Sequence, residues 1–310
     1  MRPCIFIHTN HKQYLGAIVS QHSFKRYSDH ADEFDVRIIH TKDYPFLQAH
    51  EGEEYLRDGV TRNWRYDDLQ SFTTLRFMPP EIMNYEGRSV VVDPDVFAVG
   101  DVWPLLTRDM QGKAIITRPR KGAMSIASGG DWNSSVMLME NAKLTHWKVQ
   151  EQFESMFRME RDYRKWVTLG YEDQGTIGEL EPIWNDLDRL TPETRMVHNT
   201  RRMTQPWKSG LPVDFIPAER FRFFPPVAWV MRARRKLFGD YGLLGKYKSH
   251  PDQNQQNLFF GLLRECLENG MVSEETIKAE MEQNHVRHDA FEVMKATPPL
   301  ASVVPTKQAA

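Results

Sequence analysis

The sequence predicts an α/β protein with a mostly parallel central sheet and a C-terminal helical extension. Short apolar, β-branched runs alternate with helical patterns over the first 200 residues, as in sheets whose parallel strands are joined by helices. One of these runs, Ser89 to Val92, is uninterrupted, which is typical of a strand buried on both faces. After five prolines between positions 206 and 226, residues 255–295 show only helical patterning.

The first elements are a strand, a polar turn and a helix. The run from Cys4 to Ile7 is apolar, and Leu15, Ile18 and Val19 then recur at helical spacing. Residues 41–65 are charged and have little apolar periodicity, so we expect a loop there. The other expected elements are strands at Phe34–Ile39, Ser89–Val92, Ala114–Thr117, Ser135–Met139 and Met196–Val197, and helices at Leu69–Arg76 and Leu144–Arg161.

The change of pattern divides the chain into two expected parts. A main α/β domain covers residues 1–210, and a mainly helical extension covers residues 211–310. The tail from about residue 298 is expected to be disordered, because it is short, terminal and rich in proline and small residues.

The composition excludes several classes of protein. The chain has 310 residues with 40 Lys+Arg against 42 Asp+Glu, so it lacks the basic surplus of a protein that coats nucleic acid. Its two cysteines, Cys4 and Cys266, form neither a CxxC pair nor a disulfide framework, which indicates a reducing compartment. No run approaches the roughly 18 apolar residues of a membrane span, and the first apolar run is too short for a signal peptide. We expect a cytoplasmic protein with no nucleic-acid partner.

The strongest local signal is the pair of carboxylates in Asp93-Pro94-Asp95, directly after the buried strand. Parallel sheets place ligands at the carboxyl ends of their strands. Two hard oxygen donors so close together suit Mg²⁺ or Mn²⁺, and such a cation suits a diphosphate. Asp-Pro-Asp is also good turn chemistry, so the alternative is an ordinary polar strand end.

A second cluster follows the short strand at Met196–Val197. His198 is a candidate third ligand, and its imidazole would favour Mn²⁺ over Mg²⁺. Arg201 and Arg202, with Lys208 further on, are candidates to hold phosphate oxygens. The alternative is a buried, hydrogen-bonded histidine beside a solvated basic loop. Two other polar groups, at residues 131–135 and 170–175, can bind a polyhydroxylated ligand or simply cap turns.

The order and spacing of these pieces resemble glycosyltransferase family 8, of the glycogenin and bacterial lipopolysaccharide galactosyl- and glucosyltransferase kind. VVVDPDVFAVGDVWPLL resembles the family's Y-L-D-x-D-x-x-V-x-G-D-L, and WNSSVMLM resembles F-N-S-G-V-M-L-M. HNTRRMTQPWK resembles H-x-x-G … K-P-W, and Asp173-Gln174-Gly175 resembles D-Q-D. The turn with His8-Thr9-Asn10 and Tyr14, and a helix that ends in Arg76, complete a match over residues 4–208.

The resemblance implies a GT-A fold and the transfer, with retention, of a hexose from a nucleotide sugar, usually UDP-linked, to a carbohydrate or glycolipid acceptor. It implies that Asp93, Asp95 and His198 hold Mn²⁺ (or Mg²⁺) against the donor diphosphate. Asn133, Asp173 and Gln174 would form the catalytic side that faces the donor sugar, with Asp173 a candidate nucleophile by resemblance alone. The residues expected to bind the donor elsewhere are His8, Thr9, Asn10, Tyr14, Arg76, Arg201 and Lys208.

The chain departs from the family pattern at three positions. Gly175 replaces the second aspartate of D-Q-D, the glycine of the histidine motif is absent, and Gln205 stands where a lysine normally meets the leaving diphosphate. The missing lysine and glycine favour, as an alternative, a nucleotide-sugar-binding protein with little or no turnover. A nucleotidyltransferase is a weaker alternative, because residues 8–14 contain no glycine-rich phosphate loop.

Cations and aromatic residues are interspersed between residues 220 and 248. Such a segment can contact an anionic membrane or a lipid-linked acceptor, which would place the protein at the inner face of the membrane. We favour the alternative, in which a helix packs its apolar side on the main domain and exposes its arginines to solvent.

Overall fold

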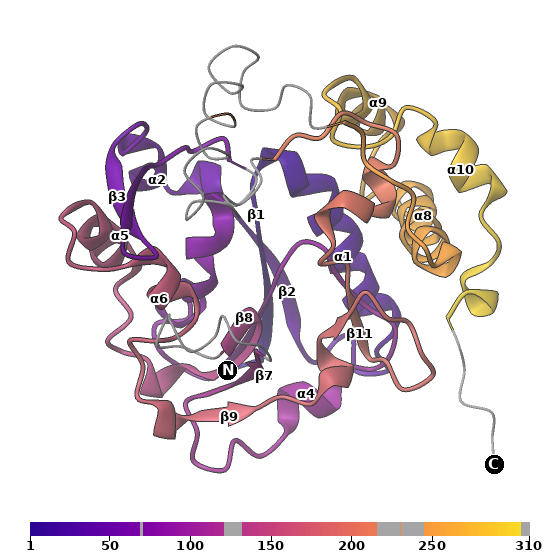
Figure 1. Cartoon of the computed structure of the whole chain (residues 1–310). Coiled ribbons are helices and arrows are strands. Elements are labelled where there is room, and N and C mark those ends of the chain that lie inside the picture. Colours follow the sequence, from indigo (N-terminus) through magenta and orange to yellow (C-terminus); the bar gives the residue numbers. More distant parts are fainter. Residues whose placement is uncertain (69–70, 121–131, 216–229, 231–244, 305–310) are drawn as a thin grey trace.

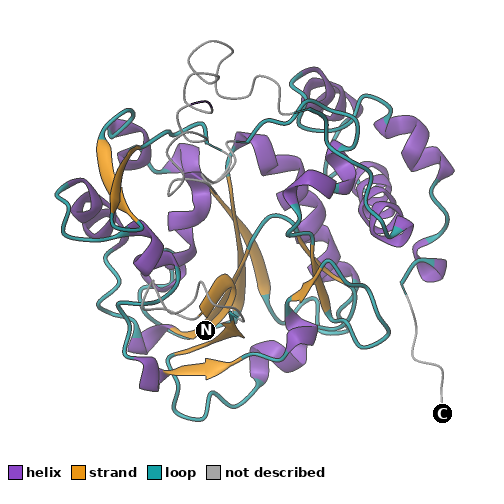
Figure 2. Cartoon of the chain, viewed as in Figure 1, coloured by secondary structure: helices purple, strands orange, loops and turns teal. Residues whose placement is uncertain are grey.

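The computed structural model describes residues 1–68, 71–120, 132–215, 230 and 245–304. Its centre is a six-stranded sheet with the order β2-β1-β5-β8-β7-β9, which runs through the middle of the molecule in Figures 1 and 2. All its strands are parallel to one another except β8, so the mostly parallel sheet is confirmed. The strands are β1 (Cys4–Thr9), β2 (Asp35–His40), β5 (Arg88–Val92), β7 (Ile115–Pro119), β8 (Trp132–Glu140) and β9 (Ile177–Glu179).

Two smaller sheets accompany the central one. The first has the order β10-β11-β6, formed by Asp186–Leu187, Met196–His198 and Val96–Ala98. The second is the hairpin of β3 (Glu54–Arg57) and β4 (Val60–Asn63). The α-helices are α1 (Tyr14–Arg26), α2 (Phe46–Ala49), α3 (Pro79–Ile82), α4 (Trp103–Thr107), α5 (Val149–Phe157), α6 (Tyr163–Val167), α8 (Gln253–Glu268), α9 (Glu274–Glu282) and α10 (Ala290–Ala296).

The central strand β5 is buried on both faces, as its uninterrupted apolar run predicts. Side chains alternate between the two faces of a strand. Val91 therefore joins a cluster that contains Phe153 of α5 and Trp166 of α6. Val90 and Val92 join a different cluster on the opposite face, with Leu105 of α4. These two cores hold the carboxyl end of β5 in place, and the acidic pair follows it directly.

The three C-terminal helices form the expected helical extension and pack against α1. In Figure 1, α8, α9 and α10 lie together at one side of the molecule, with α1 between them and the sheet. Leu15, Ile18 and Val19 of α1 share one hydrophobic cluster with residues of α8 such as Leu262 and Leu263. The extension is therefore bound to the main α/β part through a continuous apolar core.

Three of the local expectations were wrong. Residues 41–65 are not a loop, because they contain α2 and the hairpin β3–β4. The strands of this hairpin are charged and largely exposed, so they lack the apolar alternation by which a half-buried strand is predicted. The helix expected over Leu69–Arg76 is a 3-10 helix at Ser71–Phe77. The single helix expected over Leu144–Arg161 is shorter, because α5 begins only at Val149 and ends at Phe157.

The expected disorder of the tail is also wrong for residues 298–304. A 3-10 helix covers Leu300–Ser302, and both Leu300 and Val303 are buried in the cluster of the C-terminal helices. Gly261 of α8 makes this packing possible, since a Cβ atom at that position would lie 2.6 Å from Leu300 Cδ2. The apolar residues of the tail thus supply contacts that outweigh the entropy of ordering it.

The part of the chain that the structure describes contains no helix long and apolar enough to cross a bilayer. Most of the basic segment 220–248, for which we weighed membrane contact, lies outside the described residues.

An ion-pair cluster also joins α1 to α8. Glu265 on α8 accepts hydrogen bonds from Arg26 Nε at 2.7 Å and from His22 Nε2 at 2.7 Å, both on α1. Burial alone would raise the pKa of Glu265, but these two partners outweigh burial and lower it. A carboxyl whose pKa is lower in the folded than in the unfolded chain stabilises the fold above its unfolded pKa of about 4.3, and loses that contribution as the pH falls through its folded pKa.

We therefore expect Glu265→Gln to destabilise the protein by up to about 1 kcal/mol at pH 7 and by less at pH 3. Urea unfolding of the wild type and the variant at both pH values measures this. Glu268→Gln, at an exposed glutamate on the same helix, is the control and should change stability at neither pH. A destabilisation by Glu265→Gln that is equal at pH 7 and pH 3 would contradict the ionic origin of the effect.

Candidate metal centre

Strand pairing brings Asp93, Asp95 and His198 together. Ile7 of β1 lies opposite Val92 of β5 in the parallel sheet, so both strands end at the same edge and Asp93 follows there. In the small sheet, His198 of β11 lies opposite Val96, the residue after Asp95. One ligand atom from each of the three side chains lies within 4.8 Å of the others.

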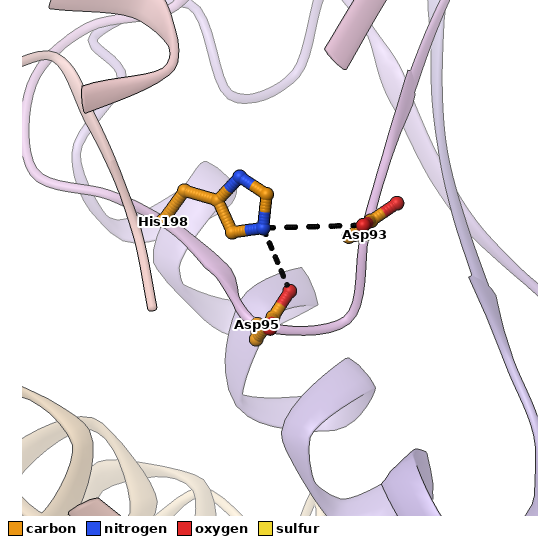
Figure 3. A group of neighbouring side chains, drawn as sticks. All are labelled: Asp93, Asp95 and His198. Atoms are coloured by element: carbon orange, nitrogen blue, oxygen red, sulfur yellow. Dashed lines mark ion pairs between the residues drawn. The ribbon is translucent and has the colours of Figure 1, made fainter. Parts of the chain in front are cut away.

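Figure 3 shows the imidazole of His198 directed at both carboxylates. His198 Nε2 lies 3.2 Å from Asp95 Oδ1 and 3.9 Å from Asp93 Oδ2. The three residues that the sequence predicts to share one site therefore lie together, although His198 is far from Asp93 and Asp95 along the chain.

Asp93 is held by two side chains besides those of the cluster. Arg76 donates to both of its oxygens, from Nε at 3.0 Å and from Nη2 at 2.5 Å. His8 Nε2 lies 3.0 Å from Asp93 Oδ1. Burial alone would raise the pKa of the Asp93 carboxyl, but Arg76 and His8 outweigh burial and hold it well below its usual range. Burial lowers the pKa of His8, which favours its neutral ring, and a neutral ring can still donate a hydrogen bond to Asp93.

A buried hydrogen-bond chain fixes the orientation of His198. The amide oxygen of Asn185 can only accept, so His198 Nδ1, at 2.8 Å, carries the proton that it receives. Asn185 Nδ2 donates to Ser135 Oγ at 3.1 Å, and Ser135 Oγ donates to Asn133 Oδ1 at 2.9 Å. This tautomer leaves Nε2 of the neutral ring with a lone pair that faces Asp93 and Asp95, as metal-binding histidines require.

Without a metal, the same arrangement favours the protonated ring. Burial alone would lower the pKa of His198, but the carboxylate of Asp95, and after it that of Asp93, outweigh burial and raise it. A divalent cation and a proton therefore compete for Nε2.

The residues fit a divalent cation. In an octahedral shell with bonds of about 2.1 Å, neighbouring donors lie about 3.0 Å apart and opposite donors about 4.2 Å apart, and the spacings around His198 Nε2 fall in this range. Asp95 Oδ1 is buried and receives no hydrogen bond from the residues that the structure describes, so a cation would satisfy it. Carboxylate oxygens with one imidazole nitrogen are a donor set suited to Mn²⁺.

Gln205, which replaces the family's lysine, lies at this cluster. Its Nε2 donates to Asp95 Oδ2 at 3.2 Å, and its buried Oε1 has no hydrogen-bond partner among the described residues. Gln205 thus positions Asp95 and keeps one polar atom free.

The residues expected to bind the donor near β1 are mostly occupied by the protein itself. Thr9 is fully buried. Asn10, also fully buried, caps the turn before α1 and donates to Asp68 O and Ser71 Oγ. Tyr14 is half-buried at the start of α1, with its ring 5.6 Å from that of His40. Of this group, only His8 and Arg76 contact an acidic residue of the cluster, Asp93.

The residues expected to face the sugar lie at the ends of β8 and of a short 3-10 helix. Asn133 belongs to β8 and touches the cluster through Ser135. Gln174 accepts a hydrogen bond from the indole of Trp132, the neighbour of Asn133, at 2.7 Å. Asp173 is exposed and caps the 3-10 helix at Gln174–Thr176. The structure therefore links Gln174 to the strand of Asn133, but gives Asp173 no contact with the metal cluster.

The two basic residues after His198 take different positions. Arg201 is exposed and its Nε lies 3.8 Å from Asp188 Oδ2. Lys208 is fully buried, and its Nζ is paired with the carboxylate of Asp214 beside the ring of Tyr247. This placement does not support phosphate contact by Lys208, because its ammonium group has no exposed surface.

Sequence reasoning missed Asn185, which orients His198, and treated Gln205 only as a lost lysine. No motif points to Asn185, since it follows a 3-10 helix at Pro182–Trp184 in a segment without recognisable periodicity. The pattern HNTRRMTQPWK placed Gln205 near the site, but its contact with Asp95 depends on the pairing of β6 with β11.

Comparison with known proteins shows distant likenesses only. No protein-family model matches the chain, and no curated protein matches its sequence. The solved structures to which it is similar include the galactosyltransferase LgtC with donor and acceptor sugar analogues, at 13% identity over 66% of this chain and 89% of that one, with a TM-score of 0.47. Others are the glycosyltransferase GlyE of Streptococcus pneumoniae (13% identity, 87% and 64%, TM-score 0.45) and mouse xyloside xylosyltransferase 1 (12% identity, 65% and 98%, TM-score 0.44). Because these likenesses are distant, the function is inferred below from this chain's own side chains.

Proposed function

We propose that this protein is a metal-dependent glycosyltransferase of the GT-A type and of family 8. It would move a hexose, with retention, from a UDP-linked sugar to a carbohydrate or glycolipid acceptor. The observation that carries the proposal is the convergence of Asp93, Asp95 and His198 at the carboxyl edge of the sheet. An ordinary polar strand end would not need a buried imidazole held in its metal-binding tautomer by Asn185.

A divalent cation bound there would act as a Lewis acid on the donor diphosphate and stabilise the charge that develops on it as it leaves. The protein's part is to hold the two carboxylates rigidly. Arg76 and His8 fix Asp93, and Gln205 fixes Asp95, so neither carboxylate must reorganise during the reaction.

Positive charge on the leaving side would come from the loop after His198. Arg201 is exposed and Arg202 is half-buried there, which leaves both side chains within reach of solvent. We assign them the role that Lys208, buried against Asp214, is not placed to fill. On the sugar side we propose Asn133, Asp173 and Gln174, supported by the family resemblance and by the hydrogen bond from Trp132 to Gln174.

A second candidate function is nucleotide-sugar binding with little or no turnover. The observation that favours it is Gln205, a neutral residue where the family pattern has a lysine, and one already engaged with Asp95.

The proposal is tested by thermal unfolding with a panel of nucleotide sugars, each measured with Mn²⁺ and with a chelator. We expect one donor to raise the midpoint of unfolding in Mn²⁺ and not in chelator, since ligands that bind only the folded state stabilise it by mass action. Hydrolysis of that donor in Mn²⁺ separates the enzyme from the binding protein. If no donor stabilises the chain in Mn²⁺, or if all do so equally in chelator, the proposed function is overturned.

A further inference from the structure

A pocket lined by arginines lies beside the metal centre. Arg76 separates the two: its Nε and Nη2 face Asp93, while its Nη1 donates at 2.9 Å to Ser134 Oγ in the wall of the pocket. The pocket opens to solvent and has a cavity volume of about 170 Å³, which is smaller than the usual site that encloses a whole drug-sized ligand. Arg57, Arg120 and Arg164 also line it, and none of the described residues in its wall is acidic.

Two of these arginines carry charge that no carboxylate of the described chain neutralises by an ion pair. Arg164 lies on α6, and its guanidinium makes no hydrogen bond or ion pair with any residue that the structure describes. Arg57, at the end of β3, stacks on the ring of Tyr163 at 4.7 Å and donates only one long hydrogen bond, of 3.5 Å, to Tyr55. Guanidinium groups present several fixed donors, which match the oxygens of a carboxylate or phosphate.

The nearest acid on α6 does not compensate them. Asp162 caps this helix: its Oδ1 accepts from the backbone N–H groups of Arg164 and Lys165, and its Oδ2 accepts from that of Gly59. Arg57 and Arg164 thus leave positive charge beside the cavity, which an entering anion would neutralise.

The pocket also offers groups suited to a sugar ring. The side-chain nitrogen of Asn133, in the wall, makes no hydrogen bond with a described residue and can donate to a hydroxyl group. Trp132 adds an apolar surface, and its indole N–H is already paired with Gln174. Aromatic surface next to fixed polar groups is the usual composition of a small-molecule site.

We infer that this pocket binds an anionic sugar, that is, a saccharide bearing a carboxylate or a phosphate on its ring. The sugar is part of either the donor or the acceptor. That the pocket binds an anion is argued from the pocket alone, whereas the role of the bound sugar in a transfer reaction rests on the proposed function. The pocket is not needed for the donor diphosphate, whose counter-charge comes from the cation of the Asp93–Asp95–His198 cluster on the other side of Arg76.

The test compares ligands that differ only in charge. Binding in Mn²⁺ is measured by calorimetry for UDP, for UDP-glucose against UDP-glucuronate, and for methyl glucoside against methyl glucuronide and glucose 6-phosphate. We expect one anionic ligand to bind at least about tenfold more tightly than its neutral counterpart, the effect of one good charged hydrogen-bond pair. Preference for UDP-glucuronate places the anion on the donor, and preference for methyl glucuronide or glucose 6-phosphate places it on the acceptor.

Arg164→Gln should remove this preference and leave the affinities for UDP and for the neutral ligands unchanged. Arg57→Gln tests the same point if the first variant does not fold, and Arg164→Lys should retain part of the preference. Arg158→Gln is the matched control, because Arg158 is exposed at the end of α5 and, among the residues that the structure describes, pairs only with Glu160. It should alter no affinity.

Two results would overturn the inference. The first is equal binding of charged and neutral sugars by the wild type. The second is an Arg164→Gln variant that loses as much affinity for UDP as for the anionic sugar, which would assign the pocket to the diphosphate. The outcomes also separate this inference from the proposed function. If the protein binds UDP only with the metal and shows no preference for charged sugars, the inference about the pocket is wrong and the proposed function stands. If the protein binds no UDP but prefers charged sugars in a way that depends on Arg164, the proposed glycosyltransferase function is wrong and the inference about the pocket stands.

Discussion

Asp95→Asn should lower turnover about a thousandfold and abolish measurable Mn²⁺ binding, because it removes one of the two carboxylates of the cluster that would neutralise the cation. Asparagine has nearly the same shape as aspartate, and its oxygen can still accept the hydrogen bond from Gln205 Nε2. We therefore expect the fold to be unchanged. Manganese binding followed by electron paramagnetic resonance, together with donor hydrolysis, measures both effects.

Asp101→Asn is the control for this experiment. Asp101 belongs to the same aspartate motif, but it accepts from the backbone N–H of Trp103 at 3.0 Å and from Ser28 Oγ at 2.5 Å, at the start of α4. Asparagine can make the same contacts, so Mn²⁺ binding and turnover should remain as in the wild type. If Asp95→Asn also retained wild-type Mn²⁺ binding and turnover, the metal would have no place in the mechanism.

Lys208→Met should destabilise the protein by roughly 2 to 3 kcal/mol, because it leaves the carboxylate of Asp214 without its ionic partner in a largely buried position. Burial lowers the pKa of Lys208, although the carboxylate of Asp214 acts in the opposite direction. Burial alone would raise the pKa of Asp214, but the ammonium group of Lys208 outweighs burial and lowers it. Each charge therefore depends on the other. Urea unfolding at pH 7 measures the loss.

The double variant Lys208→Met, Asp214→Asn should recover part of that loss, since asparagine needs no counter-ion and can still accept from Tyr247. The donor affinity of the double variant distinguishes a structural lysine from a phosphate-binding one. We expect it to match that of the wild type. A stable Lys208→Met variant that binds UDP tenfold more weakly would instead restore the role first expected from the sequence.

The acidic half of the metal cluster was predictable because Asp93 and Asp95 follow a recognisable apolar strand. Val90 to Val92 identify a buried strand, and the carboxyl edge of a parallel sheet is where ligands gather. His198 could be placed with Asp93 and Asp95 only by resemblance, since the contact depends on the pairing of β11 with β6, and three residues carry too little periodicity to reveal it.

The arginine pocket and the buried lysine were not predictable, for a different reason. Arg57 and Arg164 meet because β3 packs against α6, and no local pattern in the charged segment 41–65 signals a hairpin. Lys208 appears in the sequence within a basic, polar loop. Its burial depends on Asp214 and on Tyr247, which returns from a separate segment of the chain.

The way α1 is shared between the two parts of the molecule limits how the protein can be re-engineered. One side of this helix lies against the small sheet through the hydrogen bond from Ser20 Oγ to Val96 O, one residue from Asp95. Its Leu15, Ile18 and Val19 belong to the same apolar core as α8. A chimera that joins residues 1–210 to a foreign C-terminal partner would expose these apolar side chains of α1 to water and disturb the helix beside the acidic pair. The helical extension is therefore not an exchangeable module.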